Sequence, residues 1–212
     1  QKGAAAPVLE AEVYMPTINS VVLKDKAVLA TCDSYDAETF TMTVSDNALV
    51  SHFDISCSTG ELNVSKNAQV TGTVAVTSKM YLNASNSAQV SLTQNGGNAF
   101  VSQANSAYVD YKATLNTLEV ESAGGSESHI SGTASLLKVT GAGLSRVDAE
   151  LLESKDGDVV LSGSAKCHAN VTDHLKVNLV GGSMLTFKRN PVFEIDRIVN
   201  STLIKADDAK RK

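Results

Sequence analysis

The phrase KNAQV at residues 66–70 recurs as NSAQV at 86–90 and as NSAYV at 105–109. Each phrase holds a small residue followed two positions later by an apolar one, and the phrases are about 19–20 residues apart. Weaker copies extend the series along the chain. The small residues of the eight phrases are Ala48, Ala68, Ala88, Ala107, Ser128, Ser145, Ala165 and Met184. A repeat this regular predicts one structural unit stacked many times.

A second set of apolar residues repeats with nearly the same period. Its members come in pairs two residues apart, with a mostly polar residue between them, which is the alternation typical of a half-buried strand. Both side chains of a pair are expected to face the interior. The pairs are Met42 and Val44, Leu62 and Val64, Leu82 and Ala84, Ala99 and Val101, Leu118 and Val120, Leu137 and Val139, Val159 and Leu161, and Val177 and Leu179.

A unit of about 20 residues is too short to bury its own apolar face, whereas stacked coils bury it against one another. We therefore predict an all-β fold, a parallel β-helix-like solenoid with coils of about 19–20 residues. The lack of Trp and an aromatic content of 5% agree with a narrow interior. A β-sandwich is the alternative, but nothing in a sandwich keeps the period constant. A left-handed hexapeptide helix is disfavoured because its coil is a multiple of six residues.

The ends of the chain depart from the repeat. Residues 1–40 are predicted to be N-terminal strands packed on the same domain, as a hairpin or cap with its turn at residues 24–26. Residues 41–205 are predicted to be the β-helical repeat domain and residues 206–212 a charged tail. Corner turns are expected at Asn95-Gly96-Gly97-Asn98, Gly124-Gly125, Gly141 and Gly143, Asp156-Gly157, and Gly181-Gly182.

Bulk composition excludes several classes of protein. A net charge of −5 and a pI near 5.3 argue against a nucleic-acid partner, which selects clustered Lys and Arg. No apolar run approaches the ~18 residues of a transmembrane segment. Cys32, Cys57 and Cys167 are odd in number and lack CxxC spacing, so they are predicted to be small apolar core residues. A Cys32–Cys57 bridge is the unsupported alternative.

Several phrases near the end of the repeat point to a known family. They are GLSRV at 143–147, GSAKC at 163–167, GSMLTF at 182–187 and VNSTLIK at 199–205. Over residues 40–205 the chain resembles the putative auto-transporter adhesin, head GIN domain family. The resemblance implies a coiled all-β domain on secreted or surface proteins of Gram-negative bacteria, and it brings no catalytic residues. We expect a secreted, outer-surface or periplasmic protein after signal-peptide removal, which agrees with the start at Gln1 and not at Met.

No catalytic, metal-binding or cofactor-binding motif is recognisable, and we predict none of these sites. The four histidines show no HxxxH or HxH spacing, although His129 and His168 are expected to point outward on nearby coils. Glycine-rich phosphate loops and nucleophile elbows are absent from the sequence. Parallel β-helices include polysaccharide-cleaving enzymes, so the carboxylates between Asp148 and Asp158 are the alternative, catalytic hypothesis.

Three aromatic residues stand out against the polar surface pattern. If Leu82 and Val101 point inward, Tyr81 and Phe100 point outward on adjacent coils, and Tyr108 points outward elsewhere. Exposed rings can stack on sugar faces or fill a protein interface. We therefore predict a non-enzymatic binding or adhesion scaffold for a glycan or a surface protein. A polysaccharide-active enzyme and a purely structural, self-associating module are the alternatives.

Overall fold

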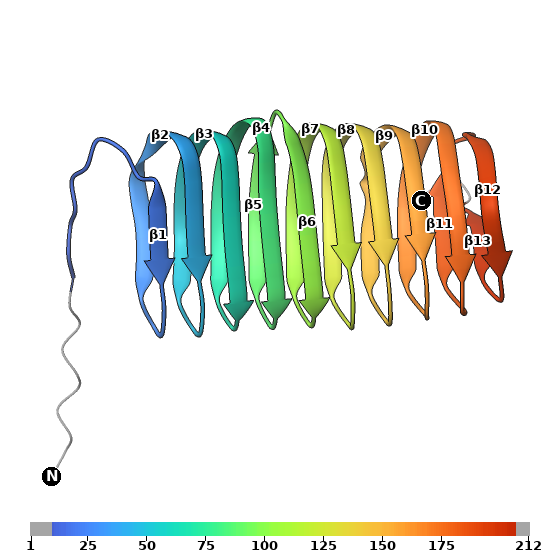
Figure 1. Cartoon of the computed structure of the whole chain (residues 1–212), viewed down its shortest axis with the longest axis horizontal. Helices are drawn as coiled ribbons and strands as arrows, with labels where there is room; N and C mark the ends of the chain where they lie inside the picture. The colour runs from blue at the N-terminus through green and yellow to red at the C-terminus, as the bar shows by residue number, and fades with distance from the viewer. Residues whose placement is uncertain (1–9, 207–212) are drawn as a thin grey trace, which may run out of the picture.

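The computed structural model describes residues 10–206, and this part of the chain is entirely β-structure and irregular turns. It forms one parallel solenoid of about 10 turns with roughly 19 residues per turn (Figure 1), which confirms the predicted fold class. These residues contain no helix, and so none long and apolar enough to cross a membrane. The strands are β1 (Ser20–Leu23), β2 (Val28–Val44), β3 (Leu49–Lys66), β4 (Gln69–Asn86), β5 (Gln89–Asn95), β6 (Asn98–Asn105), β7 (Tyr108–Ser122), β8 (Glu127–Gly141), β9 (Arg146–Leu161), β10 (Lys166–Val180), β11 (Met184–Lys188), β12 (Val192–Val199) and β13 (Thr202–Lys205).

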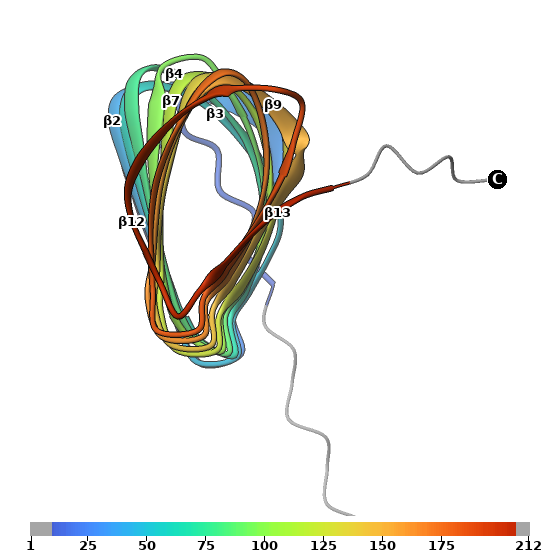
Figure 2. The same ribbon diagram turned by 90° about the vertical axis from the view of Figure 1, so that its right-hand side faces the viewer.

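Each coil runs along one long side of a flattened oval and returns along the other (Figure 2). Neighbouring coils pair in parallel register, so that Val50 stacks on Val70 on one side and Leu62 on Leu82 on the other. All the residues of the predicted strand pairs are buried. The interior is therefore a continuous stack of small and medium apolar side chains, and no antiparallel pairing of the kind a β-sandwich uses occurs among the described strands.

The register differs from the predicted one in three coils. Alignment by apolar side chains alone gives repeats of unequal length. In the structure, backbone pairing keeps the number of residues per coil nearly constant, so some interior positions hold polar side chains. Polar Gln103 and Ser128 are consequently buried at positions where other coils carry apolar residues. Leu82 lies opposite Val101, where Ala99 was predicted. The next coil places Ser126, and not Ser128, at the position of Ala107. Near the end of the solenoid, Ser183, and not Met184, takes the position of Ala165.

The repeated phrase marks the sharp corner of the coil. Lys66, Asn86 and Asn105 have positive φ angles of 63°, 62° and 64°, a conformation that asparagine tolerates better than most residues. The next backbone N–H donates to the equivalent carbonyl one coil earlier, as from Ser106 to Asn86 at 2.9 Å and from Gly125 to Asn105 at 2.7 Å. The ladder therefore continues around the corner. Glycine takes over the positive-φ position at Gly124, Gly143, Gly163 and Gly181.

The small residue of each phrase fills the narrow end of the oval. Ala68 and Ala88 are fully buried there, and each backbone N–H closes the turn by donating to the carbonyl three residues earlier. In one of the coils where serine replaces alanine, its hydroxyl finds partners within the turn. Ser126 Oγ lies 2.8 Å from Ser122 Oγ and donates to the Ala123 carbonyl at 2.9 Å. Only a small side chain fits this position without pushing the coils apart.

The predicted N-terminal hairpin is wrong. β1 pairs in parallel with the second half of β2, from Ser20 opposite Thr41 to Leu23 opposite Val44, so residues 20–44 form a coil of the solenoid. The turn at residues 24–26 is the same corner as elsewhere, because Asp25 has a φ of 60° and accepts a hydrogen bond from Asn47 at 2.7 Å. Residues 11–16, which precede this coil, line one side of a half-open recess of about 780 Å³ at its end.

Two smaller predictions also need correction. Asp156-Gly157 lies within β9 and not in a corner turn; an added Cβ on Gly157 would come within 2.8 Å of Val171, so this glycine makes room for packing. Cys57 and Cys167 are buried as predicted, but Cys32 is exposed, and all three are free thiols. Burial raises the pKa of Cys167 to about 12, with a smaller contribution from Asp148. The charged tail lies outside the described residues except for Ala206, and so do residues 1–9 of the N-terminal cap.

A row of charges on the outer surface follows from the same register. In a parallel stack each side chain sits ~4.8 Å from its equivalents in the neighbouring coils, where like charges repel. The row alternates in sign along five coils. Its members are Glu119, Lys138, Asp158, Lys176 and Glu194. At its end, the hydrogen bond to Glu194 and then that to Asp196 raise the pKa of Lys176 to about 12.

Replacement of Gly132 tests the close approach of the coils. Its φ is 110°, and an added Cβ would lie 1.9 Å from the Ala113 carbonyl oxygen. We expect Gly132→Ala to lower the free energy of unfolding by about 2–4 kcal/mol, because the ladder must shift and the backbone is strained. Urea unfolding followed by circular dichroism measures the change. Gly125→Ala is the matched control: its Cβ would meet only Asn105 at 3.5 Å, and an equal effect of both substitutions would contradict this account.

A buried hydrogen-bond chain holds the tight turn between β5 and β6. Tyr111 is fully buried, and burial raises its pKa. Its hydroxyl donates to Gln94 Oε1, and Gln94 Nε2 donates to the carbonyls of Gly96 at 2.9 Å and Asn98 at 3.1 Å. The side chains thus satisfy backbone groups that the turn at residues 95–98 removes from the ladder.

Removal of the Tyr111 hydroxyl should therefore be costly. Tyr111→Phe leaves Gln94 Oε1 buried without its donor, and we expect a loss of about 1–3 kcal/mol in the free energy of unfolding. Tyr108→Phe, at an exposed tyrosine, should change stability by less than about 0.5 kcal/mol. The same urea experiment reads both variants. Equal midpoints for Tyr111→Phe and the wild type would show that the hydroxyl contributes nothing.

Candidate functional site

The predicted aromatic residues fall into two separate places. Tyr81 and Phe100 are opposite one another on β4 and β6, with ring centroids 6.3 Å apart and planes inclined by 56°. Tyr81 is 39% exposed and Phe100 is half-buried. The ammonium of Lys79 lies 4.7 Å from the Tyr81 centroid and 5.6 Å from that of Phe100. The pair therefore presents an aromatic and cationic surface, with the two rings tilted and not coplanar.

Tyr108 does not join this pair. It lies in the other half of the coil, where β7 follows the corner, and its strand neighbours are Gln89 and Glu127. Its ring is 5.6 Å from that of His129. Desolvation, followed by the charges of Asp110 and Glu127, raises the pKa of Tyr108.

Amide side chains line the surface next to the aromatic pair. In the row beside it, Asn83 Nδ2 donates to Asn63 Oδ1 at 2.8 Å across two coils, and Asn63 Nδ2 donates to Glu61 Oε1 at 2.8 Å. Glu61 is the strand neighbour of Tyr81. Rings and hydrogen-bonding groups thus lie side by side on one rigid face.

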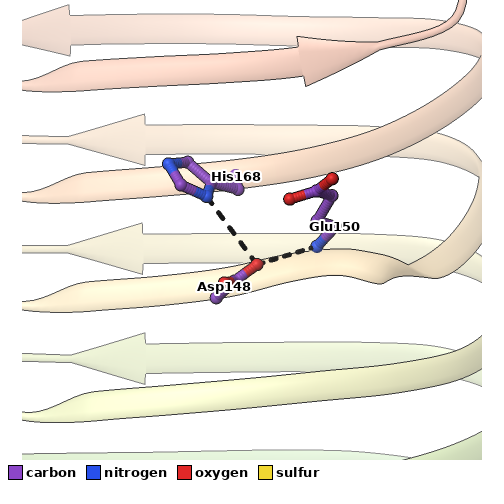
Figure 3. A group of neighbouring side chains, drawn as sticks. All are labelled: Asp148, Glu150 and His168. Carbon is purple, nitrogen blue, oxygen red and sulfur yellow. Dashed lines mark hydrogen bonds and ion pairs between the residues drawn. The ribbon is translucent and has the colours of Figure 1, made fainter. Parts of the chain in front are cut away.

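A cluster of histidine and carboxylate groups lies on the Tyr108 side of the solenoid. His129, Asp148 and His168 occupy equivalent positions on β8, β9 and β10. Asp148 Oδ1 lies 3.8 Å from His168 Nδ1, and Oδ2 lies 3.9 Å from His129 Nδ1. Glu150 completes the cluster, and Figure 3 shows its carboxylate beside Asp148 and His168. Sequence spacing missed the cluster because its members come from successive coils, about 20 residues apart.

Neighbouring charges surround this cluster. Lys188 Nζ lies 2.6 Å from Glu150 Oε1, and Glu127 Oε1 lies 3.4 Å from His129 Nε2. The Glu150 backbone N–H donates to Asp148 Oδ1 at 3.2 Å. Asp148, Glu150 and His168 are all half-buried, so the cluster is open to solvent ions.

The other acids of the catalytic alternative are arranged differently. Asp156 Oδ1 lies 2.9 Å from His174 Nδ1 on the exposed surface, and Asp158 belongs to the row of alternating charges. A recess of about 550 Å³ lies elsewhere, beside Asp36 and Glu38, and its lining contains no histidine. The structure thus does not place the Asp148–Asp158 carboxylates around that recess.

Comparison with known proteins bears on the chain as a whole. Searches of curated proteins and of solved structures gave no match. A family model does match residues 38–191, which is most of the chain and most of the solenoid. The protein therefore belongs to the family described as "Putative auto-transporter adhesin, head GIN domain".

Proposed function

We propose that this domain is a non-enzymatic binding scaffold that works outside the cytoplasm, on the cell surface or in the periplasm, and recognises a glycan. The adhesin family suggests secretion. The single observation that carries the ligand class is the partly exposed Tyr81–Phe100 pair beside the hydrogen-bonded Asn63–Asn83 pair. Aromatic rings pack against the C–H surface of a sugar, and amide side chains donate and accept hydrogen bonds with its hydroxyl groups.

The scaffold suits such a ligand because it is held by pairing along its whole length. The rows Glu61–Tyr81–Phe100–Glu119 and Asn63–Asn83–Ser102–Glu121 run parallel to the stacking axis. A linear polysaccharide lying along this axis would meet equivalent positions about every 4.8 Å. Lys79 over the rings adds a cationic hydrogen-bond donor to this face.

The enzyme alternative finds less support in the geometry. Glycosidases need two carboxyl groups about 5–10 Å apart across a substrate groove. Here Asp148 and Glu150 lie beside histidines on an open face, while Asp156 and Asp158 are engaged in other contacts. We therefore place binding ahead of cleavage.

A structural role is a second candidate, favoured by one observation at the C-terminal end. β12 carries several exposed apolar side chains on the last wide coil. Among the described residues no further strand pairs with it besides β10. A coil end of this kind suits stacking on another β-domain. The exposed residues are Val192, Ile195, Ile198 and Val199.

A glycan array with the purified chain tests the proposed function, with neutral and uronic-acid polysaccharides on the same array. We expect binding, and we expect Tyr81→Ala and Phe100→Ala each to weaken it about tenfold or more, equivalent to about 1.4 kcal/mol. Tyr108→Ala is the matched control, since this tyrosine is equally exposed but lies in the other half of the coil.

Parallel incubation with the same polysaccharides measures depolymerisation. Shortened chains, lost on Asp148→Asn, would replace the binding proposal by the enzymatic one. An array without any signal, or binding that all three aromatic variants keep, would exclude the proposed glycan face. Concentration-dependent self-association that Ile195→Asp abolishes would favour the structural role.

A further inference from the structure

We propose that His129, Asp148, Glu150 and His168 form a binding site for a first-row divalent transition-metal ion, with Zn²⁺ as the probe. Imidazole nitrogens together with carboxylate oxygens are the donor set that such ions take in proteins. One ligand atom from each of Asp148, Glu150 and His168 lies within 4.8 Å of the others (Figure 3). This proposal does not depend on the glycan face, which lies in the other half of the coil.

The spacing of the ligand atoms is close to that of a loaded site. Four ligands at the usual zinc distances of about 2.0–2.2 Å stand roughly 3.4 Å from one another. His168 Nδ1 and Asp148 Oδ1 are 3.8 Å apart. Changes of side-chain rotamer that move the ligand atoms by up to about one ångström therefore bring Asp148, Glu150 and His168 onto one ion. The strands that carry them need not move.

A local break in the regular solenoid brings Glu150 into the cluster. β9 keeps register with β10 at Asp148 opposite His168, but Asn170 then pairs with Glu153, so residues 150–152 have no partner in β10. β9 shifts against β8 at the same place. Bulges of this kind redirect side chains and are frequent beside functional sites. In Figure 3 the strand bends at Glu150, whose carboxylate lies on the side of His168.

His129, on the preceding coil, lies outside the group of three ligand atoms within 4.8 Å of one another and must turn toward the ion to become its fourth ligand. Its Nδ1 lies 3.9 Å from the other carboxylate oxygen of Asp148, and its side chain is 44% exposed, which leaves it room to turn. Glu127 lies 3.4 Å from its Nε2. This contact holds Nε2 toward Glu127 and leaves Nδ1 on the side of Asp148.

Lys188 competes with the ion for Glu150. Its ammonium lies 2.6 Å from Glu150 Oε1 and supplies the positive charge that a bound metal would bring. Replacing this lysine by an uncharged side chain should therefore tighten metal binding, whereas a variant that only disturbed the fold would weaken it. An increase in zinc affinity would therefore indicate a metal site, whereas a decrease would indicate a disturbed fold.

Isothermal titration of the full, metal-stripped chain with zinc chloride at neutral pH tests the proposal. We expect one ion per chain at micromolar or tighter affinity. His168→Ala and Asp148→Asn should weaken it at least tenfold, His129→Ala less, and Lys188→Met should strengthen it severalfold. His174→Ala is the matched control, because His174 pairs with Asp156 at 2.9 Å on the same two strands but, among the described residues, belongs to no group of three possible metal ligands.

Thermal melting gives a second readout. Saturating zinc should raise the melting temperature of the wild type, and this rise should vanish in His168→Ala while the metal-free melting temperature stays the same. Zinc binding that His168→Ala leaves intact, or that His174→Ala abolishes, would overturn the assignment. Tighter binding of Ca²⁺ than of Zn²⁺ would overturn the ion class, since calcium selects oxygen ligands.

Discussion

The backbone hydrogen-bond ladder between successive coils is the constraint on which the rest of this structure depends. It runs along both long sides of the oval and continues around the sharp corner, where Ser106 donates to Asn86 and Gly125 to Asn105. Because the corner holds one residue at positive φ in each coil, only asparagine, glycine and a few others recur there. The sequence repeats with a regular period because every coil must meet this hydrogen-bonding requirement.

Register then governs the side chains. Every position is repeated in the next coil at the strand spacing, so the interior favours stacked Val and Leu, and the surface favours alternating charge or amide pairs. The row from Glu119 to Glu194 and the Asn63–Asn83 bond are examples. The same close stacking excludes a side chain at Gly132, because an added Cβ would clash with the neighbouring coil.

Candidate functional features lie where the repeat is interrupted. The Tyr81–Phe100 pair places two rings between Glu61 and Glu119 in one row, and the bulge in β9 moves Glu150 toward a histidine–aspartate row. A solenoid can accommodate both because the ladder on either side fixes the strands. Neither feature needs an inserted loop, although β9 protrudes from the oval at its bulge (Figure 2).

The sequence by itself determined the period, the identity of the buried strand pairs and the family, since each rests on local alternation and on a repeat of fixed length. It also predicted Tyr81 and Phe100 as outward neighbours. Only the tertiary structure decided the register at Ser126 and Ser183, the parallel first coil in place of a hairpin, and the exposure of Cys32. The His129–Asp148–His168 cluster belongs to this second group, because contacts between coils join residues that no spacing within one strand can reveal.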